Sequence, residues 1–374
     1  MKATRLYFID AVRAFAILMM LQGHFIDGLL DPVYKSTDHL AFNIWNYFRG
    51  NTAPVFFTIS GLIVMLLLLK AREKQTDKLR IKKSIKRGFN LILTGYLLRI
   101  PFFMWFSGHF NTYFLVTDVL QIIGLSLILL NGIYYLAKSN LYVLTGILTS
   151  IGTLIFLTEP YYRNLEVSRL PLAISNYLSK SNGSVFTIFP WFAYVCFGAV
   201  IAVAFHKFQD KPHFKLKTLS IFTASGLFLI FLSSPILSWM SQITGIDLFE
   251  SIAVYNYLNL RLGNVLITFA VFFALESRLK HPLITRLGAH TLSVYVVHFI
   301  ILYGSFIGTG LYRFLHHTLR PWPAVIGAAL FMISVSVIVL LYEAKIKAFL
   351  KMSFRKAVII FKFNTVRRLR LYRR

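Results

Sequence analysis

The sequence predicts an all-α, polytopic membrane protein, a helical bundle of about ten transmembrane helices with both termini in the cytoplasm. Composition is the first reason, because 57% of the 374 residues are hydrophobic, whereas soluble domains contain roughly 45–50%. The second reason is a succession of long apolar stretches. The third is a strong asymmetry in the distribution of positive charge along the chain.

The apolar stretches define the expected spans. A transmembrane helix needs about 20 predominantly apolar residues. On this criterion we expect spans at residues 7–30, 52–69, 88–106, 114–137, 141–158, 184–205, 218–237, 256–276, 287–307 and 323–343. Residues 1–343 are therefore expected to form one transmembrane domain. Residues 344–374 alternate basic and apolar side chains, which predicts an amphipathic cytoplasmic tail lying on an anionic leaflet.

The net charge of +26 is explained by topology better than by nucleic-acid binding. With the amino terminus inside, the inside segments hold 30 of the 40 Lys and Arg residues, nine of them in an expected loop at 70–87. The outside loops hold seven, and Arg13, Arg99 and Arg261 lie within spans. Cytoplasmic loops of membrane proteins are enriched in Lys and Arg. The asymmetry predicts a protein of the cytoplasmic (inner) membrane, with an anionic leaflet and no nucleic acid among its partners.

Several kinds of site are absent from the sequence. Its single cysteine, Cys196, excludes an intrachain disulfide framework and a multi-cysteine metal site. It has no phosphate-binding glycine loop, no His-Glu-x-x-His zinc pair and no Gly-x-Ser-x-Gly elbow. We expect neither a metal nor a permanently bound cofactor. The oligomeric state, a homodimer included, is left open.

Two ionisable residues in the first span are the strongest functional signal. Ten residues separate Arg13 from His24, so both lie on one helical face, about 16 Å apart along the axis. Ionisable side chains inside a membrane are costly and mark functional sites by default. Arg13 falls near the cytoplasmic side and His24 near the outer side. A pairing of Arg13 with Asp10 one turn earlier, or a packing role for His24, is the structural alternative.

Further polar residues are expected near His24, in the outer half of the bundle. They are Arg99, Asp118, Arg261 and His298, with His39 in the loop after the first span. Such a cluster requires a cavity filled by water or substrate, because buried charges need partners or solvent. The plainer interpretations are that the two arginines extend to the interface, that His298 is structural and that His39 is an ordinary surface residue.

Several segments together resemble the membrane-bound acyltransferase superfamily. Arg13 and His24, preceded by Ile9-Asp10, resemble the signature of type-three acyltransferases, as do residues 53–61 (APVFFTISG) and 287–298 (LGAHTLSVYVVH). Residues 118–124 (DVLQIIG) and 189–192 (FPWF) are similar to the heparan-α-glucosaminide N-acetyltransferase branch. The resemblance covers roughly residues 5–305.

The resemblance implies an acyl-CoA donor, such as acetyl-CoA, on the cytoplasmic side and a carbohydrate acceptor outside. Arg13 and His24 map onto the arginine and histidine of the type-three signature, whereas the glucosaminide branch implies His39 as the catalytic histidine. That branch has Asn at the His24 position, so both histidines remain candidates. Arg87 loosely matches the branch's arginine-rich third span.

Acyl transfer requires a base and a donor to the developing oxyanion. We therefore expect His24 or His39 as the base, and Arg13, Asp10 and Arg87 around the donor. The expected acceptor contacts are Arg99, Asp118, Arg261 and His298. The alternative is a multi-pass transporter or flippase of a lipid-linked or acylated sugar, which would predict internal repeats, and the sequence has none.

Overall fold

The computed structural model describes residues 6–36, 38–137, 140–167 and 169–346. Over these residues the regular structure is helical, apart from an isolated backbone bridge between Leu30 and Leu319, so the all-α prediction is confirmed. Most of the expected basic tail, 347–374, lies outside the described residues. The helices are α1 (Tyr7–Leu29), α2 (Leu40–Arg49), α3 (Thr52–Glu73), α4 (Asp77–Arg99), α5 (Phe102–Phe106), α6 (Val119–Leu136), α7 (Leu141–Leu157), α8 (Glu159–Tyr162), α9 (Leu172–Leu178), α10 (Ile188–Phe208), α11 (Phe214–Leu227), α12 (Ser233–Thr244), α13 (Asp247–Val254), α14 (Tyr257–Ala274), α15 (Pro282–Ala289), α16 (Thr291–Tyr303), α17 (Leu311–Leu315) and α18 (Pro321–Leu341).

Seven helical segments of the described chain are long and apolar enough to cross a membrane. An eighth is added if α15 and α16, which are bent by 71° relative to each other, form one span. The seven are Tyr7–Leu29, Leu40–Glu73, Thr112–Leu136, Ile188–Phe208, Phe214–Thr244, Tyr257–Ala274 and Pro321–Ala344. The protein is therefore a helical membrane protein with several candidate spans, and the expected count of about ten spans is not confirmed.

Two of the missing spans are α4 and α7, and the third is the expected span 287–307, which counts only if α15 and α16 are taken together. The expected span 88–106 is displaced, because α4 starts at Asp77 and ends at Arg99. Its first half is rich in lysine and arginine, which are good helix formers but poor membrane residues. Pro101 follows its end, and a residue that precedes proline disfavours the α conformation. The expected span 141–158 is matched by α7, whose 17 residues make it a shorter apolar helix.

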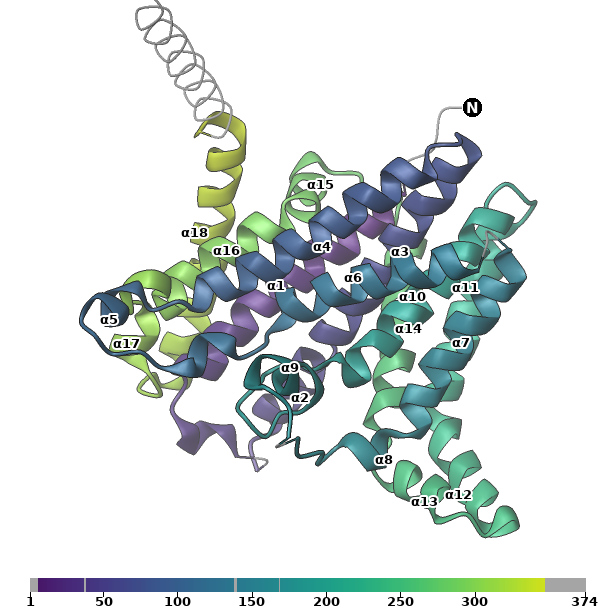
Figure 1. The fold of residues 1–374 in the computed structure, drawn as a ribbon, viewed down its shortest axis with the longest axis horizontal. Helices are drawn as coiled ribbons and strands as arrows, with labels where there is room; N and C mark the ends of the chain where they lie inside the picture. Colours follow the sequence, from purple (N-terminus) through teal and green to yellow (C-terminus); the bar gives the residue numbers. More distant parts are fainter. Residues whose placement is uncertain (1–5, 37, 138–139, 168, 347–374) are drawn as a thin grey trace, which may run out of the picture.

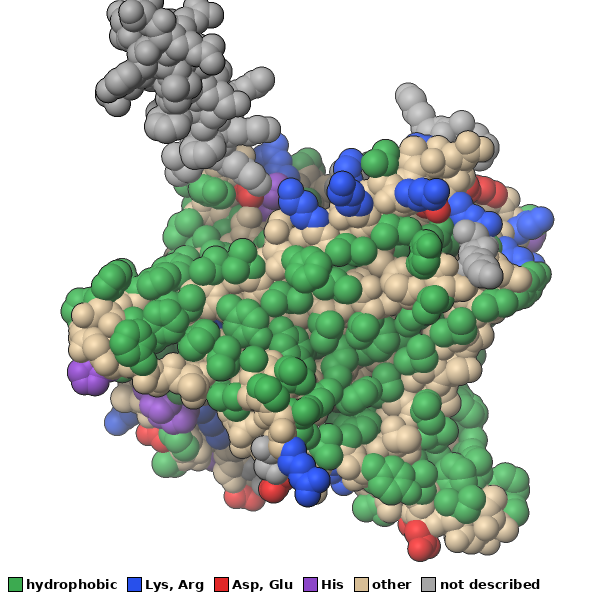
Figure 2. All heavy atoms as spheres, in the orientation of Figure 1, with side chains coloured by type: hydrophobic (Ala, Val, Ile, Leu, Met, Phe, Trp, Pro, Cys, Tyr) green, Lys and Arg blue, Asp and Glu red, His purple; other side chains and the backbone are tan. Residues whose placement is uncertain are grey.

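The basic stretch 70–87 is not the loop that the sequence predicts. Helix α3 continues to Glu73 and α4 begins at Asp77, so only a short turn separates them. Figure 2 shows an apolar belt on the visible face, with Lys and Arg predominating along one edge, over the end of α3 and the start of α4, beside a few acidic and histidine side chains. Acidic, basic and histidine side chains are mixed along the opposite edge (Figure 2). The charge asymmetry read from the sequence is therefore also a spatial one.

Helix α1 lies at the centre of the bundle and contacts α3, α14, α15, α16 and α18 (Figure 1). Beside it, α3 and α10 approach closely because each has a glycine at the crossing. A Cβ at Gly61 would collide with the backbone of Val195, and one at Gly198 with that of Thr58. Small residues at such positions let membrane helices pack backbone against backbone. The pair α3 and α10 is thus tightly packed, and α3 in turn contacts α1, which carries Arg13 and His24.

Candidate active site

His24 lies in the last two turns of α1 and faces α16. Its Nδ1 is 2.9 Å from the hydroxyl oxygen of Tyr303, the last residue of α16. The ring of His298, also on α16, packs edge-on against His24 at 5.2 Å between centroids. His298 is fully buried. It therefore supports the imidazole of His24 from behind, while Tyr303 holds one ring nitrogen.

Arg99 and Asp118 form a buried ion pair close to His24. Their Nη2 and Oδ2 atoms are 2.6 Å apart, and the side chains are only 6% and 8% exposed. Asp118 also caps α6, since its carboxylate accepts from the backbone N–H of Val119 and Gln121 completes a capping box. The guanidinium of Arg99 lies over the ring of Phe299. Buried charges persist when they are paired in this way, so the pair forms a fixed polar wall.

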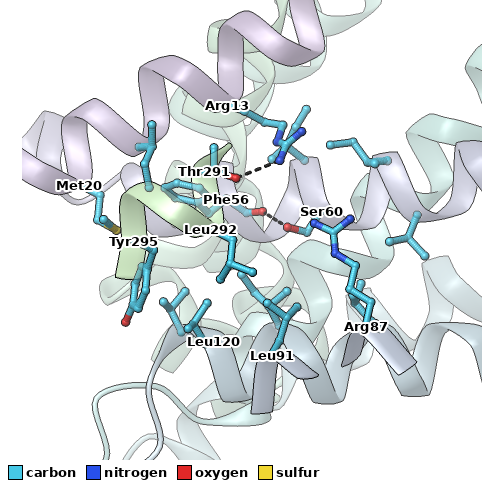
Figure 3. A pocket seen from close by; sticks show the side chains of 17 residues that line it. Arg13, Met20, Phe56, Ser60, Arg87, Leu91, Leu120, Thr291, Leu292 and Tyr295 are labelled. Atoms are coloured by element: carbon cyan, nitrogen blue, oxygen red, sulfur yellow. Dashed lines mark hydrogen bonds between the residues drawn. The ribbon is translucent and has the colours of Figure 1, made fainter. Parts of the chain in front are cut away.

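A narrow cavity of about 100 Å³, here called the Arg13 cavity, lies between α1, α3, α4, α6 and α16. Arg13 donates from Nη2 to Oγ1 of Thr291 at 2.9 Å. Figure 3 shows Arg13 and Arg87 entering from different helices near Ser60, with Met20 and Tyr295 at the other end. The remaining lining is largely aliphatic. The cavity therefore has a cationic end and an apolar stem.

Two further cavities meet at His24. The central cavity, of about 230 Å³, is lined by His24, Arg49, Asp118, Trp191 and Arg261 among others. The Arg99 cavity, of about 550 Å³, shares His24, Arg49 and Asp118 with it and extends to Arg99, Tyr113 and Tyr303. The central cavity in turn shares Met20, Phe56 and Val119 with the Arg13 cavity. Neighbouring cavities thus lead from the two arginines to the imidazole.

The structure brings most of the predicted site residues to these cavities. Arg13 and Arg87 line the first of them. His24 and Asp118 line both larger ones, whereas Arg99 and Arg261 each line one of the two. Asp10 is buried in α1 against Gly288 of α15.

His39 is placed apart from this group. It is exposed at the start of α2 and stacks loosely on Tyr34, with ring centroids 6.4 Å apart. It does not line any of the three cavities described above. The sequence left His24 and His39 as competing candidates, and of the two it is His24 that lines the described cavities.

Sequence reasoning missed Tyr303, Thr291 and Arg49. Arg49 was expected in an outer loop, but it ends α2, pairs with Asp27 and lines both larger cavities. A tyrosine near the end of an apolar span is commonplace, so nothing in the sequence distinguished Tyr303. Among the described residues, no group of three or more His, Cys, Asp or Glu side chains is arranged to hold a metal ion.

The comparison with known proteins agrees with the residues that suggested an acyltransferase. The family model for the heparan-alpha-glucosaminide N-acetyltransferase catalytic domain matches residues 5–238. This region carries His24, Arg99 and Asp118. No curated protein matches the sequence. Since the model covers more than half of the chain, this protein belongs to the heparan-alpha-glucosaminide N-acetyltransferase catalytic family.

Proposed function

We propose that this protein is a membrane acyltransferase that moves an acetyl group from acyl-CoA to a hydroxyl or amine of a carbohydrate. The donor enters from the basic, cytoplasmic face and the acceptor from the opposite face. One observation carries the proposal: His24 lies where two larger cavities meet, and these adjoin the arginine-lined Arg13 cavity. The family supports an acetyltransferase, and this arrangement supports acetyl transfer across the membrane.

The Arg13 cavity suits the donor. Acyl-CoA has an anionic nucleotide end and a thin, largely uncharged pantetheine arm that ends in the thioester. Arg13 and Arg87 would bind the anionic part, with Asp10 nearby, and the aliphatic stem would surround the arm. Two guanidinium groups can bind such an anion by charge-assisted hydrogen bonds. The lysines and arginines at the α3–α4 edge would concentrate it by long-range attraction.

His24 is suited to activate the acceptor. When its Nδ1 carries the proton and donates to the oxygen of Tyr303, Nε2 is free to take a proton from the attacking hydroxyl or amine. The new bond forms between the acceptor oxygen or nitrogen and the thioester carbonyl carbon. The carbon–sulfur bond breaks, and the thiolate of CoA recovers the proton from His24. This balance describes direct transfer. In an acyl-histidine route, Nε2 of His24 would first attack the thioester and release the thiolate of CoA; the acceptor would then attack the acyl-imidazole carbonyl, the carbon–nitrogen bond to His24 would break, and the proton of the acceptor would pass to the released imidazole or thiolate.

The acceptor side is assigned to the two larger cavities. Arg99, Asp118 and Arg261 line them and present charged hydrogen-bonding groups. His298 lies behind His24, so we assign it a positioning role in place of the expected acceptor contact. A transporter or flippase remains the alternative function, but the family match favours the enzyme.

Acetylation of the surface glycan in cells carrying His24→Ala or His39→Ala tests the proposal. A general base contributes about 10²–10⁴-fold to the rate, so His24→Ala should abolish detectable acetylation. His39→Ala should retain it, because that side chain is exposed and away from the cavities. Both variants must be present in the membrane at normal levels. Normal acetylation with His24→Ala would refute the mechanism, and loss with His39→Ala alone would transfer the role of base to His39.

A further inference from the structure

A fourth cavity adjoins the central one. This Lys180 cavity has a volume of about 250 Å³ and lies between the segments that precede α10 and α14. It shares two residues, Trp191 and Arg261, with the central cavity. Its other polar lining includes Arg163 and Lys180. A ligand with one part at His24 could therefore place another part here.

The charge of this cavity is positive and only partly compensated. None of its lining residues is acidic. Arg163 is neutralised by Glu159, whose carboxylate accepts from its Nε and Nη2. Arg261, by contrast, forms no ion pair with any carboxylate of the described chain and lies over the ring of Tyr257 at 5.3 Å. Lys180 is exposed and likewise forms no ion pair with a carboxylate of the described chain. Desolvation, and to a smaller extent the charge of Arg261, lower the pKa of Lys180. Within the described chain, Arg261 and Lys180 are thus two cations of this cavity without a paired anion.

The walls are rich in hydrogen-bond donors and aromatic rings. Trp191 is 7% exposed, and its indole N–H has no acceptor among the described residues. Tyr255 and Tyr257, with ring centroids 5.0 Å apart, line the same space. A buried donor without a partner is costly, and aromatic faces combined with polar groups suit amphipathic ligands such as sugars. The missing component is an acceptor of hydrogen bonds that carries negative charge.

Gly50, at the end of α2, supports the same interpretation. A Cβ at this position would lie 3.0 Å from Nη2 of Arg261. A side chain there would press on the guanidinium at the junction of the two cavities. Glycine leaves Arg261 the space to serve both of them.

We infer that the Lys180 cavity is a second acceptor subsite, which binds the carboxylate or phosphate of a sugar unit adjacent to the unit acylated at His24. Arg261 and Lys180 hold the anion, Trp191 donates to it, and the tyrosine rings contact the sugar. The acceptor is then an anionic saccharide of at least two units. The inference rests on the proposed function only in identifying the bound anion as part of the acceptor.

Binding to the purified full-length protein tests the site without any acyl transfer. The probes are D-glucuronate, glucose 1-phosphate and neutral glucose, titrated by calorimetry. We expect at least one anionic sugar to bind and glucose to bind at least about tenfold more weakly, because hydrogen bonds to charged groups are the stronger ones. The two anionic probes distinguish a carboxylate from a phosphate.

Variants then locate the site. Arg261→Gln and Lys180→Gln should each weaken binding about tenfold, and Arg261→Lys should restore part of it, which excludes misfolding. Arg169→Gln, a matched loss of charge at an exposed position outside the cavity lining, should have no effect. Equal binding of glucose, or wild-type binding by both Gln variants, would overturn the inference.

A further variant separates this inference from the proposed function. His24→Ala should bind the anionic sugar normally while losing acetyl transfer. If the site binds as described but the wild-type protein transfers no acetyl group, the proposed function fails and the site stands. If transfer occurs and the acceptor KM is unchanged in Arg261→Gln and in Lys180→Gln, the subsite fails and the function stands.

Discussion

Removing one partner of the Arg99–Asp118 pair should destabilise the protein severely. Both side chains are more than nine-tenths buried and their charged atoms are 2.6 Å apart. Loss of one member leaves the other as an uncompensated buried charge, which costs about 3–5 kcal/mol. Asp118→Asn isolates this cost, because asparagine is as good a helix N-cap as aspartate and the cap of α6 is preserved. Arg99→Met removes the positive charge and keeps much of the aliphatic stem.

The double variant Arg99→Met/Asp118→Asn gives the size of the interaction. With both charges gone, no unpaired ion remains, so it should be more stable than the sum of the single losses predicts. A coupling free energy of about 2 kcal/mol or more is expected, within the range for contacting pairs of about 0.5–3 kcal/mol. The assay is unfolding of the full chain in mixed micelles by increasing SDS, followed by tryptophan fluorescence.

Arg169→Met is the matched control, because Arg169 is exposed. Surface substitutions of this kind change stability by about 0.5 kcal/mol or less. Single losses below about 1 kcal/mol for the pair, or strictly additive effects in the double variant, would refute the claim that the two charges depend on each other.

Two further predictions concern kinetics. Arg13→Gln and Arg87→Gln should each raise the KM for acyl-CoA about tenfold and change the acceptor KM little. Steady-state assays that vary one substrate at a time measure both constants. A rise in the acceptor KM alone would contradict the donor role of these arginines. Tyr303→Phe removes the hydroxyl that contacts Nδ1 of His24. We expect kcat to fall about 2–10-fold, both KM values to stay unchanged and the pH dependence of kcat to shift. An effect confined to KM would show that Tyr303 binds substrate instead of orienting the base.

The first span shows how far the sequence could be interpreted. The helical period placed Arg13 and His24 on one face, and the structure puts them in the linings of adjoining cavities. The alternative, a pairing of Arg13 with Asp10, could be considered from the sequence because the two residues are one helical turn apart. The hydrogen bond from Arg13 to Thr291 spans 278 positions of sequence, and no periodicity reports such a contact. Local geometry was therefore predictable, whereas the partner was not.

Charge at helix ends was harder to interpret. Hydropathy placed the third span at 88–106, but proline at 101 and helix-forming lysines and arginines shifted the helix to Asp77–Arg99. That shift puts Arg99 at a helix end, where it can reach Asp118 at the start of α6. The sequence predicted both residues in one polar cluster. It could not reveal their pairing, because the segment between them contains only two short helical pieces joined by irregular turns and its course depends on tertiary contacts.

The extent of the family match has a consequence for the site. The match ends at residue 238, yet Tyr303, His298 and Thr291 come from α16 and Arg261 comes from α14. The matched region alone would leave His24 without its hydrogen-bond partner and Arg13 without its acceptor. It would also remove the part of the Arg99 cavity lining that residues 299–312 provide, and Arg261 from the lining of the central cavity. Under the proposed mechanism, the catalytic unit therefore extends beyond the matched region to include α14 and α16.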